Sequence, residues 1–424
     1  MSAGNTALTA APGSASDPGE RIGALDGLRG LAVIGIVPMN VIGFAMPPAA
    51  YLNPRAFGGD APLETALWAI SFLVIEDKFR GLFAMMFGAG VAILLGKAAD
   101  HRLRDHYARM AALLGIALAH AVVLANNDVL RTYAIAGLFL PIVMGWKVRW
   151  LVWASAAIMA GQLLVSGWFA WEWIIYWFDR ASGALVDSAA HDIAEKLYGH
   201  DRDAIAAAIE RNGVGLGERI VQRLDELPQQ ARFVAASLPS SFAAMVLGVA
   251  LWRSGLLAGR WEATRAFRLA RLCAGCALPV LASLAVWAIA SGFDPIVTTA
   301  NALVWSAPFD LVLSVGIAAL AMALFGNALQ DRPLTARLAA TGRMALTNYL
   351  ATSLLFSALF AGWGLDWFAA VSRGEALVLC LVPISLMLVW SPLWLARFRQ
   401  GPAEWLWRSS ASGRLLPFRR RQRL

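Results

Sequence analysis

The sequence predicts an all-α integral membrane protein: a polytopic helical bundle of about ten transmembrane helices, with one further re-entrant or interfacial helix. Of its 424 residues, 59% are hydrophobic and only 15% are charged, whereas soluble domains carry roughly 25% charged residues. Ten apolar runs approach or reach the ~20 residues of a membrane-crossing helix. The Lys and Arg residues that flank them follow a topological pattern. These observations exclude a soluble globular enzyme.

The predicted crossings follow one another along the chain. The first, at about 28–46, is too long for the apolar core of a signal peptide and lacks a clear small-residue cleavage site, so we expect it to be retained. The others lie at about 79–96, 109–125, 128–145, 150–171, 233–252, 272–291, 299–325, 345–361 and 376–395. A shorter apolar segment, 62–76, ends in Glu76, Asp77 and Lys78. Its length alone does not decide whether it crosses.

The distribution of Lys and Arg decides the orientation. If 62–76 does not cross and the N-terminus is cytoplasmic, 24 of the 36 basic residues lie on the cytoplasmic side, as the positive-inside rule requires. Letting 62–76 cross would reverse every later loop. We therefore expect 62–76 to be re-entrant or interfacial and both termini to be cytoplasmic. The net charge of +8 then reports topology rather than nucleic-acid binding.

The domain organisation follows from the same patterns. Residues 1–20 have no periodicity and bury too little apolar surface to fold, whereas charged residues break the apolar pattern of 172–232 and the stretches 203–210 and 216–227 favour helices. We expect five parts: a disordered tail at 1–20, an N-terminal transmembrane bundle at 21–171, an extramembrane helical loop at 172–232, a C-terminal transmembrane bundle at 233–396, and an interfacial helix with a basic tail at 397–424, anchored on anionic membrane lipids.

His120 and Asp128 are the first candidates for chemistry. An ionisable group inside a membrane is costly and indicates a function, and histidine can serve as general base or nucleophile near neutral pH. Asp128 follows the turn Asn126-Asn127 and opens the next helix as an N-cap. Because eight residues of continuous helix span ~12 Å, His120 and Asp128 pair only if the first helix ends early. Otherwise Asp128 only caps its helix and His120 bonds a backbone carbonyl.

A second cluster lies at the cytoplasmic mouth of the first helix, in the stretch Leu25-Asp26-Gly27-Leu28-Arg29-Gly30. Arg29 either pairs with Asp26, which would cap the helix, or holds a ligand that carries phosphate, since its planar fork suits phosphate oxygens. Asn40, three helical turns later, shares the face of Arg29. This mouth is therefore a candidate anion site.

Asp310 falls near the middle of the eighth predicted helix. A lone carboxylate at that depth is costly, so we expect it to face the bundle interior and to be paired or protonated. A proton relay or a cation site is the functional alternative for this residue.

Several motifs, taken together and in order, resemble the YeiB-like family of bacterial inner-membrane proteins, known as domain of unknown function 418. They are LDGLRGLAVIGIVPMNV with PPAAYLNP (25–54), KFRGLFAMMFGAG (78–90), His120 with Asn127-Asp128-Val129-Leu130 and Tyr133-Ala134, GRMALTNYL (342–350), and RFRQGPAEWLWR (397–408). The resemblance implies a multi-pass protein of the bacterial inner (plasma) membrane.

That family in turn resembles a branch of the transmembrane acyltransferase superfamily, which includes the bacterial type-three acyltransferases and the lysosomal heparan glucosaminide acetyltransferase. Its members carry an acyl group from a cytoplasmic donor such as acetyl-CoA to an acceptor, often a sugar, on the far side. The type-three branch has an Arg and, about three turns later, a His. Here the Arg is Arg29 but Asn40 stands at the His position, so another base is needed, and His120 is the intramembrane histidine of the sequence.

The resemblance implies a membrane acyltransferase that moves an acyl group from a cytoplasmic acetyl-CoA donor, whose phosphates Arg side chains hold, to an acceptor at the outer face. His120, oriented by Asp128, deprotonates the acceptor or takes the acyl group transiently, and Tyr133 or Asn40 binds the carbonyl oxygen. The implied catalytic residues are His120, Asp128 and Tyr133, and the implied donor-binding residues are Arg29, Asn40 and Arg343.

Two other functions stay open on the sequence. One is a proton-coupled transporter or exporter of a small molecule, in which Asp310 and His120 form a polar path. The other is a non-catalytic membrane component that binds a lipid or a partner protein. The expected partners are membrane lipids and a glycan or small-molecule acceptor, without nucleic acid, and no metal cofactor is expected. The sequence does not determine the oligomeric state.

Overall fold

The computed structural model describes residues 18–59, 61–96, 102–125, 128–184, 189–326, 329 and 332–420. Across these ranges the regular secondary structure is helical, apart from one antiparallel bridge between Phe398 and Arg419. The predicted all-α polytopic bundle is confirmed. Most of the tail predicted at 1–20 lies outside the described residues.

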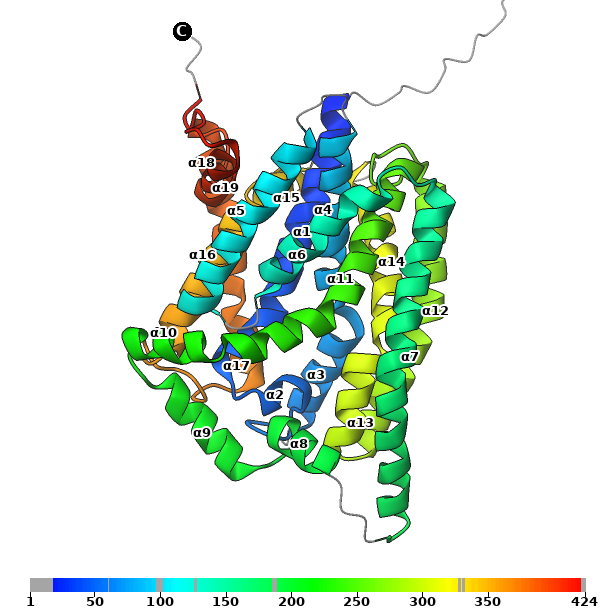
Figure 1. Cartoon of the computed structure of the whole chain (residues 1–424), viewed down its shortest axis with the longest axis vertical. Helices are drawn as coiled ribbons and strands as arrows, with labels where there is room; N and C mark the ends of the chain where they lie inside the picture. The colour runs from blue at the N-terminus through cyan, green and yellow to red at the C-terminus, as the bar shows by residue number, and fades with distance from the viewer. Residues whose placement is uncertain are drawn as a thin grey trace, which may run out of the picture.

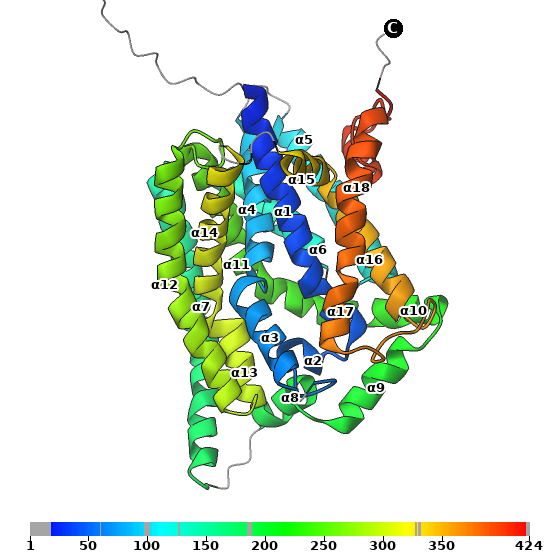
Figure 2. The same ribbon diagram turned by 180° about the vertical axis from the view of Figure 1, so that it is seen from behind.

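Ten apolar helical stretches correspond to the ten predicted crossings (Figures 1 and 2). Within the described ranges, eight are long and apolar enough to span a membrane, and two are shorter apolar helices. They contain α1 (Pro18–Ala45), α4 (Lys78–Leu95), α5 (Arg102–Val123), α6 (Val129–Val143), α7 (Val148–Ala181), α11 (Leu227–Ser254), α12 (Ala263–Ala290), α14 (Ala307–Phe325), α16 (Ala345–Phe360) and α18 (Leu381–Arg397). The two shorter ones are α6 and α16.

The remaining helices connect or flank the long ones. They are α2 (Ala49–Leu52), α3 (Pro62–Val74), α8 (Ala189–Tyr198), α9 (Arg202–Asn212), α10 (Leu216–Asp225), α13 (Pro295–Ala300), the π-helix η1 (Asn301–Trp305), α15 (Pro333–Arg343), α17 (Arg373–Leu379) and α19 (Pro402–Ser412). α9 and α10 correspond to the helices predicted at 203–210 and 216–227. α7 continues to Ala181, well past the predicted boundary at 172.

The segment predicted to be re-entrant or interfacial forms α3, which continues below α4 (Figure 2). A break separates the two helices at Ile75–Asp77, where Asp77 has a left-handed φ of 57°. Together they make one apolar stretch of 34 residues, about 51 Å of helix, which exceeds the ~30 Å hydrocarbon core of a bilayer. α3 therefore adds length below α4 and does not form a hairpin of its own; its interfacial position stays a prediction.

Glycines allow two helix pairs to pack at backbone contact. A Cβ on Gly88 of α4 would lie 2.0 Å from the carbonyl oxygen of Met245 in α11. A Cβ on Gly30 of α1 would lie 2.0 Å from the Leu338 oxygen in α15, and one on Gly342 would lie 1.9 Å from the Asp26 oxygen. Such small residues are a common means of joining helices in membranes. The second contact brings Arg29 and Arg343 to the same end of the bundle.

α19, predicted as an interfacial helix, is docked onto the bundle. The Glu404 carboxylate accepts hydrogen bonds from the backbone N–H groups of Leu346 (2.7 Å) and Thr347 (3.1 Å) and from the Thr347 hydroxyl (2.5 Å). Trp407 Nε1 donates to the Arg109 carbonyl at 2.7 Å. Glu404 therefore satisfies two of the free backbone donors at the start of α16, as an N-cap residue otherwise does.

The start of α1 and the C-terminal helix α19 lie at the same end of the bundle (Figures 1 and 2). An even number of crossings requires this arrangement. We refer to this end as the α1 end; that it faces the cytoplasm stays a prediction.

Candidate functional site

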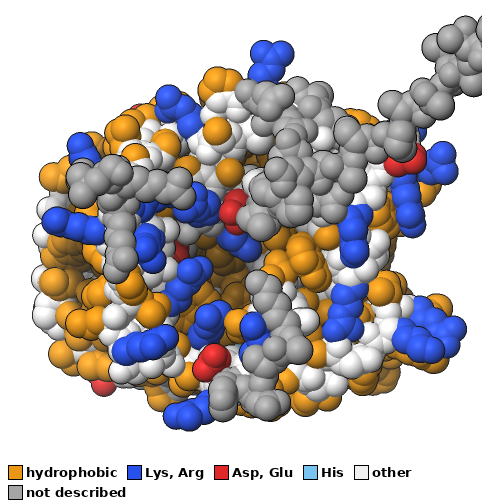
Figure 3. Space-filling view, turned by 90° about the horizontal axis from the view of Figure 1, so that it is seen from above, with side chains coloured by type: hydrophobic (Ala, Val, Ile, Leu, Met, Phe, Trp, Pro, Cys, Tyr) orange, Lys and Arg blue, Asp and Glu red, His pale blue; other side chains and the backbone are white. Residues whose placement is uncertain are grey.

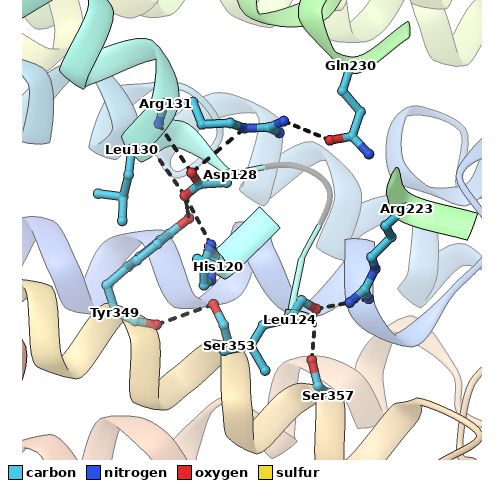
Figure 4. Close-up of polar contacts among 10 residues, drawn as sticks. All are labelled: His120, Leu124, Asp128, Leu130, Arg131, Arg223, Gln230, Tyr349, Ser353 and Ser357. Atoms are coloured by element: carbon cyan, nitrogen blue, oxygen red, sulfur yellow. Dashed lines mark hydrogen bonds and ion pairs between the residues drawn. The ribbon is translucent and has the colours of Figure 1, made fainter. Parts of the chain in front are cut away.

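His120 and Asp128 meet inside the bundle (Figure 4). α5 ends at Val123 and α6 begins at Val129, so the chain reverses between them. His120 Nδ1 lies 3.1 Å from Asp128 Oδ1, and both side chains are almost completely buried. The early helix end that the pairing requires is therefore present. Asp128, at the start of α6, is only 4% exposed, so it lies inside the bundle and not at its outer surface.

The Asp128 carboxylate is stabilised from several sides. It caps α6, accepting from the backbone N–H groups of Leu130 (3.1 Å) and Arg131 (3.2 Å). The Tyr349 hydroxyl of α16 donates to Oδ1 at 3.3 Å. Arg131 Nε lies 3.9 Å from Oδ2, and its Nη1 donates to Gln230 of α11 at 2.7 Å. Donors and a positive charge thus surround the carboxylate, so its oxygens have polar partners although it is buried.

The second ring nitrogen of His120 is available for chemistry. Among the described residues neither ring nitrogen meets hydrogen-bond geometry, although the side chain is buried; Nδ1 has the Asp128 carboxylate beside it, whereas Nε2 has no recorded polar contact. A carboxylate beside Nδ1 favours the tautomer that carries its proton there, which leaves a lone pair on Nε2. His106, the other buried histidine of α5, also has one ring nitrogen, Nδ1, without a hydrogen bond, but its Nε2 lies 2.9 Å from the Gly137 carbonyl oxygen. His106 therefore has a backbone partner, whereas His120 has a carboxylate.

Arg223 of α10 holds the end of α5. Its guanidinium donates to the carbonyls of Val123 (2.7 Å), Leu124 (3.0 Å) and Val122 (3.3 Å), three of the acceptors that a helix leaves free at its C-terminus. Ser357 of α16 donates to Leu124 as well, at 2.9 Å. Burial lowers the pKa of Arg223 to about 10, so it remains a cation at neutral pH. α10 thereby determines where α5 ends, and hence the approach of His120 to Asp128.

Tyr133, the predicted catalytic tyrosine, makes its hydrogen bond elsewhere. Its hydroxyl donates to the Arg80 carbonyl at 2.7 Å, and its ring packs against Phe83 and Phe87. The phenol that contacts Asp128 is Tyr349, whose ring centroid lies 5.3 Å from that of His120. Sequence reasoning did not select Tyr349, although it stands in the motif GRMALTNYL.

Arginines from four helices, α1, α5, α15 and α19, gather at the α1 end. Arg29 Nη1 lies 2.7 Å from Asp26 Oδ1, so the predicted pair forms, and Arg343 and Arg408 also interact electrostatically with Asp26. Arg408 is in turn close enough to repel Arg29, Arg343 and Arg109. Figure 3 looks onto this end, where Lys and Arg side chains surround a hollow and few acidic groups show. One carboxylate among several guanidinium groups leaves an excess of positive charge that suits an anion.

One face of α1 connects the two regions. Arg29 and Asn40 lie on the same side of α1, about 16 Å apart along its axis. Ile36, one turn before Asn40, packs in a cluster with Leu130 and Tyr349. Asn40 is half-buried. This face therefore extends from the arginine cluster to the surroundings of His120.

Asp310 faces the interior, as predicted, and its partner is Lys78. Lys78 Nζ lies 2.7 Å from Asp310 Oδ1, and both side chains are buried. The Lys78 ammonium also donates to the Phe72 carbonyl of α3, and the Ser314 hydroxyl lies 2.7 Å from the Lys78 carbonyl oxygen. Sequence reasoning missed this partner, although the demand of a buried carboxylate for a cation and the charge at the end of the segment 62–76 both pointed toward it.

These features define a multi-pass membrane protein with a buried His–Asp pair in its interior and a cluster of guanidinium groups at one end. Among the described residues, no group of three or more His, Cys, Asp or Glu side chains is placed to hold a metal ion. Comparison with known sequences adds the family. The chain belongs to the YeiB-like family of domain of unknown function 418.

Three comparisons establish this family membership and show how much of the chain the similarity covers. Residues 251–414 match the family described as "Protein of unknown function (DUF418)". The chain is 30% identical to the uncharacterized protein YeiB of Escherichia coli (strain K12), over 92% of this chain and 96% of that protein. It is 27% identical to the uncharacterized protein YxaH of Bacillus subtilis (strain 168), over 92% and 94% of the two chains. No solved structure matches.

Proposed function

We propose that this protein is a membrane-embedded acyltransferase that moves an acyl group from a CoA thioester at the α1 end to an acceptor in the bundle interior. The observation that supports it best is the buried His120–Asp128 contact with an unoccupied Nε2. A buried imidazole held by a carboxylate on one nitrogen and open on the other is the usual arrangement of a general base. Arg29 and Arg343 would hold the phosphates of the donor.

In the proposed reaction, His120 Nε2 takes the proton from an acceptor hydroxyl or amine as that group attacks the thioester carbonyl. The new bond to the carbonyl carbon forms, the carbon–sulfur bond breaks, and the proton passes from His120 to the departing thiolate. Asp128 stabilises the imidazolium in between and keeps the ring oriented. The Asn40 amide, on the same face of α1 as Arg29, would donate to the carbonyl oxygen; Tyr133 would serve only after releasing the Arg80 carbonyl.

The distance between the arginine cluster and His120 suits a CoA thioester as the donor. CoA carries its thioester at the end of a long flexible arm, remote from its phosphates. The α1 face from Arg29 to Asn40 extends about 16 Å, so phosphates can bind at the mouth while the thioester reaches toward His120. Holding both ends of the donor would supply the orientation that accelerates acyl transfer.

Labelled acetyl transfer in inside-out membrane vesicles tests the base. Radiolabelled acetyl-CoA is added to vesicles from cells that express the protein, and label in lipid or glycan products is counted. We expect His120→Gln to lower incorporation by about 10²–10⁴-fold, the usual contribution of a general base. His106→Gln is the matched control, a buried histidine on the same helix, and should leave most incorporation intact. Equal loss in both variants, or none in His120→Gln, would contradict the proposal.

Binding of acetyl-CoA tests the arginine cluster independently of any acceptor. With purified protein, acetyl-CoA should raise the thermal unfolding midpoint, and Arg29→Ala should reduce that shift, because one charge-assisted contact to phosphate is lost. Arg104→Ala, at an exposed arginine of α5, is the control and should bind as the wild type does. A wild-type protein without any acetyl-CoA-dependent shift would rule out the donor.

A proton-coupled transporter is the second candidate, and the Lys78–Asp310 pair favours it. The pair lies at a helix break deep in the bundle, and intramembrane ion pairs often mark proton paths. In proteoliposomes, a transporter should move its substrate when a proton gradient is applied and should stop on Asp310→Asn. Gradient-driven flux without acetyl-CoA binding would replace the acyltransferase proposal by this one.

A further inference from the structure

An apolar groove lies among the helices α1, α3, α12, α14 and α18, whose ribbons can be followed in Figure 2. It encloses about 470 Å³ between α1, the α3–α4 junction, α12, α14 and α18, and all eleven residues that line it are Leu, Ile, Val, Phe, Pro or Gly. Gly35 shapes its floor, because a Cβ there would lie 2.1 Å from the Phe79 ring. Absence of a side chain at Gly35 lets Phe79 lie against α1.

The groove lies at the depth of the hydrocarbon core. The lining residues of α1, from Leu31 to Pro38, are about 12–22 Å along the axis from Gly23, where the apolar part of α1 begins. Ile384 of α18 is about 20 Å from the end of that helix at Arg397. Both values fall within a hydrocarbon layer ~30 Å thick.

The helices that form the groove carry exposed apolar side chains on their outer faces. Leu272 of α12 is 65% exposed, Leu386 of α18 is 53% exposed, and Leu320 of α14 is 42% exposed. In a membrane these faces contact lipid. The groove therefore opens where acyl chains are the surrounding solvent.

The chemistry of the lining selects the occupant. A glycan, a phosphate or the nucleotide of CoA would find no hydrogen-bond partner on these side chains, and an apolar cavity holds water poorly. A transmembrane helix is too large, since one turn of a cylinder ~10 Å wide occupies roughly 420 Å³ and a crossing needs more than five turns. A volume of 470 Å³ is in the range of small-ligand sites, roughly 300–1,000 Å³. A single hydrocarbon chain meets all of these conditions.

We propose that the groove binds one hydrocarbon chain of a membrane lipid. The chain lies against α1 opposite the face that carries Ile36, so α1 separates it from His120. The site is independent of the proposed acyl transfer, because it needs neither His120 nor the arginine cluster. If transfer occurs, a lipid held here is also positioned one helix away from the reaction site.

A photoactivatable lipid tests the site. Purified protein in nanodiscs is mixed with a phosphatidylethanolamine whose acyl chain carries a mid-chain diazirine, irradiated, digested and mapped by mass spectrometry. We expect label on peptides that contain the groove residues of α1 and α18, above the level on the outward faces. Ile384→Trp fills the groove and should lower groove labelling to the level of the outward faces. Leu386→Trp, the same change two residues away on the lipid-facing side, should not.

A second pair, Ile317→Trp against Leu320→Trp on α14, repeats the comparison in case one variant fails to fold. Equal labelling of the groove in wild type and in both groove-filling variants would overturn the proposal. So would label confined to the outward faces. Cross-links between two copies of the chain across the groove would show a protein occupant and would overturn it as well.

Discussion

Two buried carboxylates of the bundle, Asp128 and Asp310, are held in opposite ways. Asp128 is bound by its own helix start and by an imidazole eight residues earlier, and the far nitrogen of that imidazole has no partner among the described residues. Asp310 is bound by Lys78, more than 200 residues away, whose ammonium also bonds the Phe72 carbonyl. The His120–Asp128 pair leaves one ring nitrogen, Nε2, without a partner among the described residues. The Lys78–Asp310 pair instead joins α3, α4 and α14 through its own contacts.

Under the proposed acyl transfer, this difference separates a reaction site, at His120 and Asp128, from a structural ion pair, at Lys78 and Asp310. An ion pair that satisfies itself holds helices together and leaves nothing to offer a substrate. A polar side chain buried without a full set of partners costs stability, and such groups concentrate where function requires them. We therefore expect changes at Lys78 to act mainly on folding and changes around His120 to act mainly on chemistry.

Removing Lys78 should have the largest effect on stability. Lys78→Met leaves Asp310 buried without its cation, which costs about 3–5 kcal/mol, and should lower the midpoint of unfolding in detergent strongly. The double variant Lys78→Met with Asp310→Leu removes both charges and should recover most of the loss. If the double variant is no more stable than the single one, the Lys78–Asp310 ion pair does not hold the helices together.

Arg223→Ala should have the next largest effect. It removes hydrogen bonds from a charged group to the end of α5, a loss of about 1.5–3 kcal/mol, and should speed amide hydrogen exchange in the last turn of α5. Arg219→Ala, on the same helix but bonded to Arg211 and Asn212, is the control. Unchanged exchange at Leu124, whose N–H donates to the His120 carbonyl, would show that α10 does not position the pair.

Tyr349→Phe, compared with Tyr133→Phe, should separate an effect on acetyl transfer from an effect on stability. It removes one hydrogen bond to Asp128, worth about 0.5–1.5 kcal/mol. Tyr133→Phe removes a comparable bond to the Arg80 carbonyl and should lower stability by a similar amount. Only Tyr349→Phe should reduce acetyl transfer in the vesicle assay. Equal activity of the two variants would mean that the Tyr349 hydroxyl does not tune the His–Asp pair.

Glu404 belongs to neither the His120–Asp128 pair nor the Lys78–Asp310 pair, and it serves as a reference for a buried carboxyl group. We expect its replacement to have the smallest effect on stability. Burial raises its pKa above the ordinary 4.5, although hydrogen bonds from Thr347 oppose this. The folded state then binds the proton more tightly than the unfolded one, so Glu404 contributes stability below pH ~4.5 that is lost as the pH rises through its folded pKa. Glu404→Gln should make the unfolding midpoint depend less on pH between pH ~4.5 and the folded pKa of Glu404. Glu210→Gln, at an exposed site of α9, should leave that pH dependence unchanged.

The sequence predicted features that depend on local patterns. Ten crossings follow from apolar runs alone. The condition for His120 to meet Asp128, an early end of the first helix, could be stated in advance, but the sequence left open whether it is met. Asp310 was expected to face inward because lipid does not tolerate an unpaired carboxylate.

Contacts between distant helices could not be predicted in the same way. Tyr349 reaches Asp128 only because α16 packs beside α5 and α6, and Lys78 reaches Asp310 because α4 packs against α14. Tyr133 lies one turn into α6, and helical periodicity does not say which neighbour its hydroxyl will meet. Many combinations of helix neighbours satisfy the same apolar pattern, because lipid-facing and core-facing positions are both hydrophobic in a membrane.

The remote cap of α16 by Glu404 has a consequence for biosynthesis. The first turn of α16 leaves the ribosome 58 residues before the carboxylate that satisfies its Leu346 N–H. Until α18 has crossed and α19 has docked, that turn must rely on water or on other chains for its hydrogen bonds. A chain that terminates after α18 would therefore contain every crossing and still be recognised as incomplete, so cellular proteolysis of such truncations should begin at the α15–α16 junction.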